Sequence, residues 1–141
     1  MVTVVNVCRK KIEGCLACEY CHTQGGGKCI QQDDMQAVYP VLDAAEMLVL
    51  ASPVYYHSFT GQLQCAINRI YAFDKPKRLK KAALILSSGS DDVYGSAIYE
   101  YRGSFLEYLH LEDMGIYTAF DKQNKSPEKL EALYRFGKNL T

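Results

Sequence analysis

The amino-acid sequence predicts a doubly wound α/β domain, in which helices cover both faces of a parallel sheet. Short apolar runs typical of strands alternate along the chain with amphipathic segments typical of helices. The strand-like runs are also continuously apolar, which is expected of strands that are buried on both faces of a parallel sheet. Because 141 residues are enough for one such core, we expect a single domain over residues 1–141.

Four strands are predicted. A β-branched run indicates the first strand at residues 2–7, and shorter apolar runs indicate the others at residues 47–51, 82–86 and 115–120. Ser52 and Pro53 end the second of these, because proline has no N–H to donate to a strand ladder. In such sheets the ligand crevice lies beyond the carboxyl ends of the strands, so the loops that follow the strands are the candidate sites.

Four helices are predicted after these strands, at residues 35–45, 61–73, 94–110 and 126–139. Asp33 and Asp34 place negative charge at the amino end of the first helix, where the helix dipole favours it, and Pro40 either kinks this helix or marks its first turn. Apolar residues at i, i+3, i+4, i+7 and i+8 from Leu63 indicate the second helix. A Ser-Pro pair supplies the cap and the first turn of the last helix.

Charge and composition exclude several classes of partner. The 16 basic residues balance the 16 acidic ones, so nothing indicates a nucleic-acid partner or an anionic membrane surface. The apolar runs are too short to span a bilayer, and no secretory signal is visible in the sequence. Six cysteines without an export signal favour a reducing cytoplasm, where thiols serve metals or redox chemistry rather than disulfides.

Four of the six cysteines lie close together in the spacing C-x2-C-x2-C-x7-C. Closely spaced thiolates let one loop reach several corners of an iron–sulfur cluster, whereas structural zinc sites more often use two separated C-x2-C pairs. We therefore predict a [4Fe–4S] cluster, with a zinc site and a loop of free thiols as the alternatives. The candidate metal ligands are Cys15, Cys18, Cys21 and Cys29.

Two loops at the predicted carboxyl edge of the sheet carry a second group of candidates. The loop after residues 47–51 places a proline and two tyrosines at the mouth of the crevice, where they can offer backbone groups and an aromatic wall to a flat heterocycle. The loop after residues 82–86 (SSGSDD) has small residues that let the backbone approach a ligand closely. Packing of surface aromatics is an equal alternative for the tyrosines, because the chain contains 11 of them.

A family resemblance links these segments. Residues 15–35 (CLACEYCHTQGGGKCIQQDDM) resemble the cysteine-rich loop and following helix of flavodoxin-like NAD(P)H-dependent FMN reductases, and residues 50–69 (LASPVYYHSFTGQLQCAINR) resemble their flavin-contacting loop and helix. The compact cysteine spacing resembles that of the iron–sulfur flavoprotein branch. The resemblance implies a flavodoxin-like three-layer sandwich that binds FMN at the carboxyl edge of the sheet, with Ser52, Pro53, Val54, Tyr55, Tyr56, Ser88 and Gly89 as the cofactor-binding residues.

One part of the family pattern is missing from this sequence. Members of the family begin with a strand and a loop that holds the FMN phosphate at a helix amino terminus, whereas this chain begins at what resembles their second strand. We therefore expect a sheet of four strands that is truncated at its amino-terminal side. Three explanations are a truncated product, a partner chain that completes the sheet, and a rearrangement that pairs residues 2–7 with residues 47–51.

The function implied by the resemblance is that of an FMN-dependent oxidoreductase, which passes electrons from NAD(P)H or a reduced carrier to a flavin or a small acceptor. The flavin would supply the redox chemistry, a cluster on the four cysteines would relay single electrons, and no side chain is singled out as catalytic. We expect a cytoplasmic homo-oligomer, at least a dimer, because the sheet is incomplete. The alternative is a non-catalytic metal-binding or electron-carrier remnant that no longer binds FMN.

Overall fold

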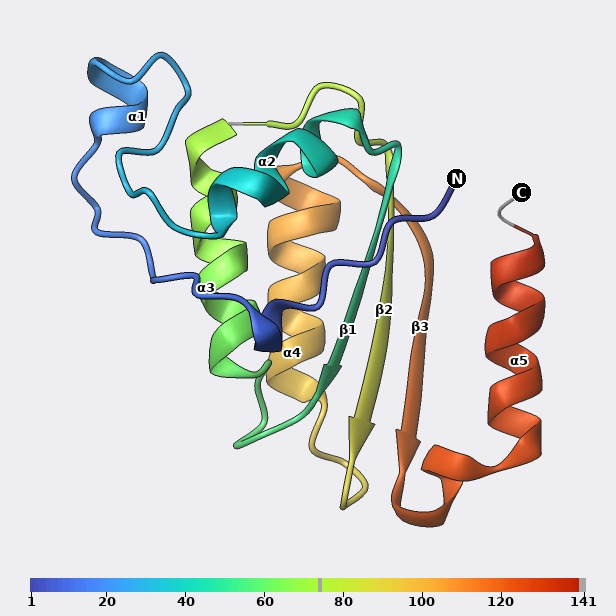
Figure 1. Ribbon diagram of the computed structural model, residues 1–141. Coiled ribbons are helices and arrows are strands. Elements are labelled where there is room, and N and C mark those ends of the chain that lie inside the picture. Colours follow the sequence, from blue (N-terminus) through green and yellow to red (C-terminus); the bar gives the residue numbers. More distant parts are fainter. Residues whose placement is uncertain (74, 140–141) are drawn as a thin grey trace. The chain divides into compact units, whose positions relative to one another are not determined.

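The computed structural model describes residues 1–73 and 75–139. Three strands form one parallel sheet in the order β1-β2-β3 (Figure 1), with β1 at Met47–Pro53, β2 at Lys81–Ser88 and β3 at Glu112–Phe120. Helices connect the strands, because parallel neighbours need a crossover connection. The predicted α/β class with a parallel sheet is confirmed, and three of the predicted strands lie where the apolar runs indicate.

The helices also lie where the sequence predicts them. The four longer helices are α2 at Met35–Ala44, α3 at Gly61–Arg69, α4 at Gly95–Tyr101 and α5 at Pro127–Lys138. α3 continues as a 3₁₀ turn at Ile70–Phe73, and α4 continues as a π-helix at Arg102–Tyr108. Three short segments were not predicted, namely the 3₁₀ turns Val7–Arg9 and Asp121–Lys125 and the helix α1 at Tyr20–Thr23. No helix in the described part of the chain is long and apolar enough to cross a membrane.

The predicted strand at residues 2–7 is wrong, and so is the expectation of four strands. Within residues 1–73 and 75–139 the sheet has three strands, and residues 1–6 have no regular secondary structure. Val2 and Val4 are exposed, whereas Val5 and Val7 pack against a small apolar cluster. A β-branched run indicates side chains that suit a pleated surface, but pairing with a neighbouring strand decides whether a strand forms. The alternative pairing of residues 2–7 with residues 47–51 is therefore wrong as well.

The chain forms two compact units. Unit 1 comprises Met1–Leu48 and Thr60–Lys81, and it carries the four cysteines of the motif. Unit 2 comprises Val49–Phe59 and Ala82–Thr141, and it carries most of the sheet with both candidate strand-end loops. The two candidate sites can therefore each be described within one unit. The single domain over residues 1–141 stays a prediction.

A small apolar cluster holds unit 1 together. Met35, Val38 and Leu42 lie at i, i+3 and i+7 on α2, so they share one face of the helix and pack against Ala66 of α3. The partly buried residues around this cluster come from the amino-terminal segment, α2, β1 and the end of α3; they are Val5, Val7, Ile12, Tyr39, Leu48, Ile70 and Phe73. The cluster packs α2 against α3 within unit 1.

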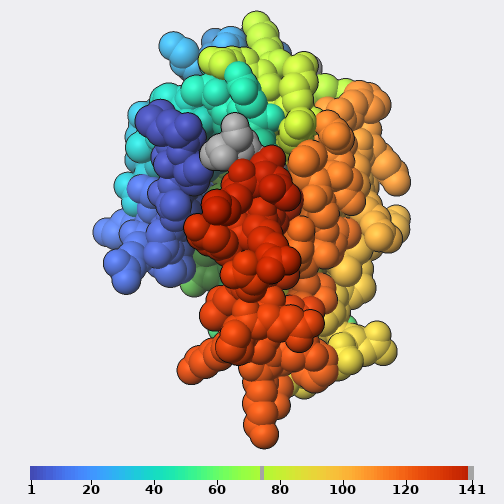
Figure 2. All heavy atoms as spheres, turned by 90° about the vertical axis from the view of Figure 1, so that its right-hand side faces the viewer, coloured from blue at the N-terminus to red at the C-terminus, as the bar shows by residue number. Residues whose placement is uncertain are grey.

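Unit 2 is built around the central strand β2. The side chains at positions 82–84 are completely buried and Leu86 is 1% exposed, as expected for a strand that is covered on both faces. α4 and α5 lie on opposite faces of this sheet (Figure 1). α5 begins at the predicted cap residue, Ser126. Figure 2 shows α5 (red) beside β3 (orange), where the rings of Tyr117 and Phe136 lie 5.0 Å apart between their centroids.

Candidate functional site

The loop after β1 forms a tight turn in unit 2. The backbones of Tyr55 and Ser58 exchange two hydrogen bonds of 3.1 Å, and the residues between them, Tyr56 and His57, have φ values of 50° and 67°. Two consecutive positive φ values are typical of a type I′ turn, which side chains other than Gly, Asn and Asp adopt only at a cost. The turn leaves Tyr55 63% exposed and Tyr56 fully exposed. The turn is therefore strained at Tyr56 and His57, and it exposes the rings of Tyr55 and Tyr56 to solvent.

Buried residues on either side of the turn attach it to the neighbouring strand. The side chains of Val54 and Phe59 are buried. The backbone N–H of Val54 donates a hydrogen bond of 2.8 Å to the carbonyl of Ser87 at the end of β2. Pro53 and Val54 thus lie beside the carboxyl end of β2, at the edge where the sequence predicts the crevice.

Ser88, at the carboxyl end of β2, belongs to a buried polar network. Its hydroxyl lies 2.8 Å from the hydroxyl of Tyr94 and also donates to the carbonyl of Ser90. The Tyr94 hydroxyl donates to the carbonyl of Ala119 at the end of β3 (2.9 Å), and the side-chain amide of Asn124 donates to the Ser88 carbonyl (2.8 Å). The network ties the ends of two strands together. Sequence reasoning missed Tyr94 and Asn124, because nothing in the local pattern marks the bonds from Tyr94 to Ala119 and from Asn124 to Ser88, whose partners lie 25 and 36 positions apart.

The backbone beyond Ser88 is open to a ligand. Gly89 is exposed, and a Cβ built on it would meet no heavy atom within 4 Å. Of the predicted cofactor residues, Ser52 and Ser88 are buried and hydrogen-bonded within the protein, whereas Tyr55, Tyr56 and Gly89 are exposed. The structure places the predicted residues at two adjacent strand ends. Exposed aromatic rings and open backbone are groups that a planar heterocycle such as a flavin ring can contact.

The cysteine loop, residues 15–30, lies in unit 1. The helix α1 within it is docked on the 3₁₀ turn that follows α3: His22 Nε2 lies 2.9 Å from the carbonyl of Tyr71, and the Tyr71 hydroxyl donates to the carboxylate of Glu19 at 3.1 Å. The first two thiols of the motif are exposed and the last two are half-buried, in the order Cys15, Cys18, Cys21 and Cys29. The loop is therefore attached to the rest of unit 1 while half of its thiols face solvent.

A glycine turn gives the cysteine loop its shape. The N–H of Gly25 donates to the carbonyl of Tyr20 at 2.6 Å, and the N–H of Gly27 donates to the carbonyl of Cys21 at 2.8 Å. A Cβ added at Gly25 would lie 2.4 Å from the Lys28 carbonyl oxygen and 2.8 Å from the ring of Tyr20. No other residue fits this position without a shift of the backbone.

The four thiols are donor groups that suit a metal, but in this conformation they are not close enough together to bind one. Burial raises the pKa of the Cys21 thiol above its ordinary value, and the neighbouring Cys29 thiolate raises it further. Within residues 1–73 and 75–139, no three His, Cys, Asp or Glu side chains are gathered so that they could hold a metal ion. Four thiols on one closed loop fit an iron–sulfur cluster in donor type and number. Binding of a cluster by all four thiols would therefore require the loop to change its conformation.

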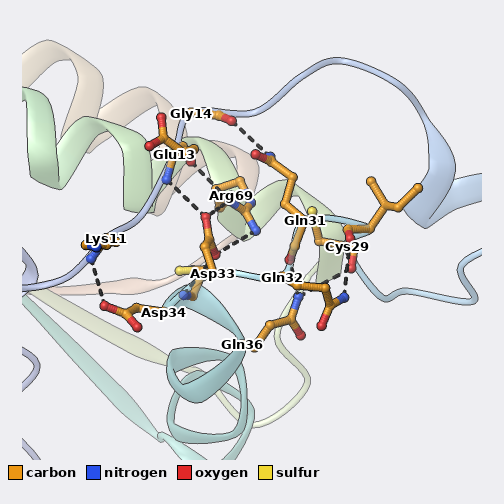
Figure 3. A network of polar contacts seen from close by, with 12 residues as sticks. Lys11, Glu13, Gly14, Cys29, Gln31, Gln32, Asp33, Asp34, Gln36 and Arg69 are labelled. Atoms are coloured by element: carbon orange, nitrogen blue, oxygen red, sulfur yellow. Dashed lines mark hydrogen bonds and ion pairs between the residues drawn. The ribbon is translucent and has the colours of Figure 1, made fainter.

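A buried ion pair closes the neck of this loop, which we define as residues 11–14 and 31–34 (Figure 3). Arg69 of α3 is 1% exposed and donates two hydrogen bonds to the carboxylate of Asp33, at 2.6 and 3.2 Å, and one to the carbonyl of Glu13 at 3.1 Å. Asp33 also accepts from the backbone N–H groups of Glu13 and Met35, each at 3.0 Å. Burial alone would raise the pKa of Asp33, but these hydrogen bonds outweigh burial and leave the pKa below its ordinary value.

A match to a protein-family model shows which class of protein has this cysteine motif and these strand-end loops. The family model described as NADPH-dependent FMN reductase matches residues 1–134. The chain belongs to this family. The resemblance stated from the cysteine motif and the strand-end loops is confirmed.

Curated relatives of this FMN reductase-family chain are iron–sulfur flavoproteins of archaea. One from Methanocaldococcus jannaschii is 37% identical over 100 residues, which cover 69% of this chain and 50% of the relative. One from Archaeoglobus fulgidus is 31% identical over 102 residues, which cover 72% of this chain and 40% of the relative. The chain thus spans about half the length of the curated relatives it matches, or less.

A solved structure supports the same fold. The Trp repressor binding protein from Bacillus subtilis matches with a TM-score of 0.62 at 17% identity, over 73% of this chain and 75% of that one. At this level of identity the match concerns the fold alone. The predicted flavodoxin-like α/β fold is confirmed by it.

Proposed function

We propose that the chain is part of an FMN-dependent oxidoreductase that passes electrons from NAD(P)H or a reduced carrier to a flavin or a small acceptor. Family membership supports the cofactor class. The observation that carries the proposal is the pair of adjacent strand-end loops in unit 2, where Tyr55 and Tyr56 are exposed and the backbone at Gly89 is open. Bound FMN would supply the hydride and electron chemistry. The protein's own groups would bind and orient the ring, through the tyrosine faces and the backbone around Gly89.

Titration with FMN tests the flavin site. We expect saturable quenching of flavin fluorescence, and we expect Tyr55→Ala and Tyr56→Ala each to weaken binding by about 2- to 10-fold, the equivalent of one aromatic contact. Tyr99→Ala and Tyr134→Ala are matched controls, because both tyrosines are exposed elsewhere in unit 2. Absence of quenching at high micromolar FMN would refute the flavin proposal for this chain. Equal effects of all four substitutions would place the flavin elsewhere.

The cysteine loop is proposed to hold a [4Fe–4S] cluster on Cys15, Cys18, Cys21 and Cys29. The iron–sulfur flavoproteins among the relatives and the four thiols on one closed loop support this assignment. Anaerobic reconstitution with iron and sulfide should yield about four of each per chain. Cys15→Ser should lower both contents, whereas Cys65→Ser, a half-buried cysteine of unit 1 outside the loop, should not. Binding of zinc alone would exclude the cluster in favour of a zinc site.

A second candidate function is a metal-binding or electron-carrier protein that does not bind FMN. It is favoured by the anchoring of the cysteine loop within unit 1, where His22 and Glu19 contact Tyr71. Stoichiometric iron and sulfide in a chain that does not quench FMN fluorescence would establish this function. Flavin binding by a chain that takes up no metal would exclude it.

A further inference from the structure

We infer that Arg69 and Asp33 are positioning residues for the cysteine loop. Their buried ion pair, which we call the lock, holds together the two branches of the neck, and the loop that extends from this neck carries the thiols that would bind a metal centre. The inference rests on the metal site proposed above and concerns what prepares the loop for it. It assigns a role in metal uptake to two side chains that lie outside the cysteine motif. One of them belongs to α3, more than thirty residues away in the sequence.

The neck is a continuous set of hydrogen bonds between its two branches (Figure 3). The backbone of Lys11 donates to the Asp34 carboxylate at 2.7 Å, and the Asp34 backbone donates back to the Lys11 carbonyl at 3.0 Å. The Gln31 side chain donates to the carbonyl of Gly14 at 3.0 Å. Together with the bond between Glu13 and Asp33, these contacts hold residues about 20 apart in sequence side by side. The entropic cost of closing the loop is therefore met before any metal binds.

Arg69 joins this neck to the core of unit 1. Its planar guanidinium reaches both oxygens of Asp33 and the carbonyl of Glu13 at once, an arrangement that a lysine ammonium does not reproduce. Its Nε is buried and has no hydrogen-bond partner in the described part of the chain. Burying an arginine with one unsatisfied N–H costs free energy of folding. This ion pair therefore differs from a solvent-exposed pair, which contributes little to stability.

Hydrogen bonds beside the neck also hold the backbone of one predicted metal ligand, Cys29. The side-chain amide of Gln36 donates to the carbonyls of Cys29 and Gln31, at 3.3 and 2.6 Å, so the second branch of the neck is fixed as far as Cys29 (Figure 3). The Tyr39 hydroxyl donates to the Arg69 carbonyl at 3.2 Å, which holds the end of α3 against α2. Cys29 is thus held in place by the backbone, whereas Cys15 beyond the other branch stays exposed. Residues that orient metal ligands in this way typically contribute 10- to 100-fold to metal affinity.

Alkylation of the metal-free protein tests the lock without relying on a cluster. In Arg69→Lys, which keeps the charge and loses the fork, iodoacetamide should label Cys21 and Cys29 several-fold faster than in the wild type, as the half-buried thiols become exposed. Mass spectrometry resolves each cysteine, and Cys65 serves as the internal reference. Arg78→Lys is the matched control, because Arg78 pairs with Glu46 on the surface of the same unit. It should leave every labelling rate unchanged.

Titration with Co²⁺ measures the consequence for metal binding. Arg69→Lys, shown by circular dichroism to be folded, should lower the apparent Co²⁺ affinity by about 10- to 100-fold, and Arg78→Lys should not. A folded Arg69→Lys with wild-type labelling rates and wild-type Co²⁺ affinity would overturn the inference. If Arg69→Lys does not fold, Gln31→Ala, which removes one neck hydrogen bond, should accelerate labelling of the same two thiols, and unchanged labelling would overturn the inference. If the wild type binds no Co²⁺, the proposed metal site fails and labelling alone decides whether the lock exists.

Discussion

Replacing Asp33 by alanine should destabilise the protein far more than any change to a surface ion pair. The substitution removes the acceptor of four hydrogen bonds, two from Arg69 and two from backbone N–H groups. Arg69 stays charged and 1% exposed, and it keeps its hydrogen bond to the carbonyl of Glu13 but loses both hydrogen bonds to a carboxylate. A buried charge left without its partner costs about 3–5 kcal/mol. That is a large share of the roughly 5–15 kcal/mol by which a domain is stable.

A surface pair in the same unit sets the scale for comparison. Arg78 and Glu46 lie 2.7 Å apart, but their side chains are 61% and 74% exposed. Such a pair contributes about 0–1 kcal/mol, because solvent screens it and both side chains lose freedom. The difference between Asp33→Ala and Glu46→Ala should therefore be at least about 2 kcal/mol.

Urea unfolding followed by circular dichroism measures this difference. With a slope of about 1–3 kcal/mol per molar urea, Asp33→Ala should lower the urea midpoint by about 1–5 M, and Glu46→Ala by a few tenths of 1 M. The double variant Asp33→Ala with Arg69→Met removes both charges and should lose less stability than the sum of the two single changes. The reasoning is refuted if Asp33→Ala unfolds at the same urea concentration as Glu46→Ala.

Three other outcomes can be checked with the same preparations. Because the folded pKa of Asp33 is lowered from 3.8, its stabilisation is complete above that pH and is lost as the pH falls through the folded value; the urea midpoint should decline there in the wild type and less in Asp33→Asn. Gly25→Ala should open the cysteine loop, because the new Cβ would lie 2.4 Å from a backbone oxygen, and should speed thiol labelling; Gly89→Ala, which meets nothing within 4 Å, should leave labelling unchanged. Tyr94→Phe removes the hydroxyl that links the ends of β2 and β3 and should cost about 1 kcal/mol per lost bond, with faster amide exchange at those ends; exchange as slow as in the wild type would contradict the role of this hydroxyl.

Much of the fold could be predicted because the relevant forces are local. The continuous apolar run at β2 predicts a strand buried on both faces, and its side chains are buried. The Ser-Pro pair at Ser126 and Pro127 predicts where α5 begins, because the cap hydrogen bond is made within one turn. Residues 2–7 show where this reasoning ends. A strand needs a partner that lies far away in sequence, and the valines alone carry no information about it.

Some features of the candidate sites could likewise be predicted from the sequence, whereas others appear only in the folded structure. The cysteine spacing and the two strand-end loops were visible as motifs, and family membership confirms the class of protein that they indicate. The lock between Arg69 and Asp33 was not visible, because the partners lie 36 positions apart and meet only when α3 packs beside the neck. The link between Tyr94 and Ala119 was hidden for the same reason.

The linear sequence therefore determined the α/β class, the positions of the helices, the donor chemistry of the cysteine loop and the family. Each of these depends on residue type and short spacing, which a chain carries before it folds. Only the tertiary structure decided the number of strands, the burial of Ser88 within its own network, and the closure of the cysteine loop by an arginine from another helix. These features depend on contacts between distant residues, and such contacts form only when apolar packing brings the segments together.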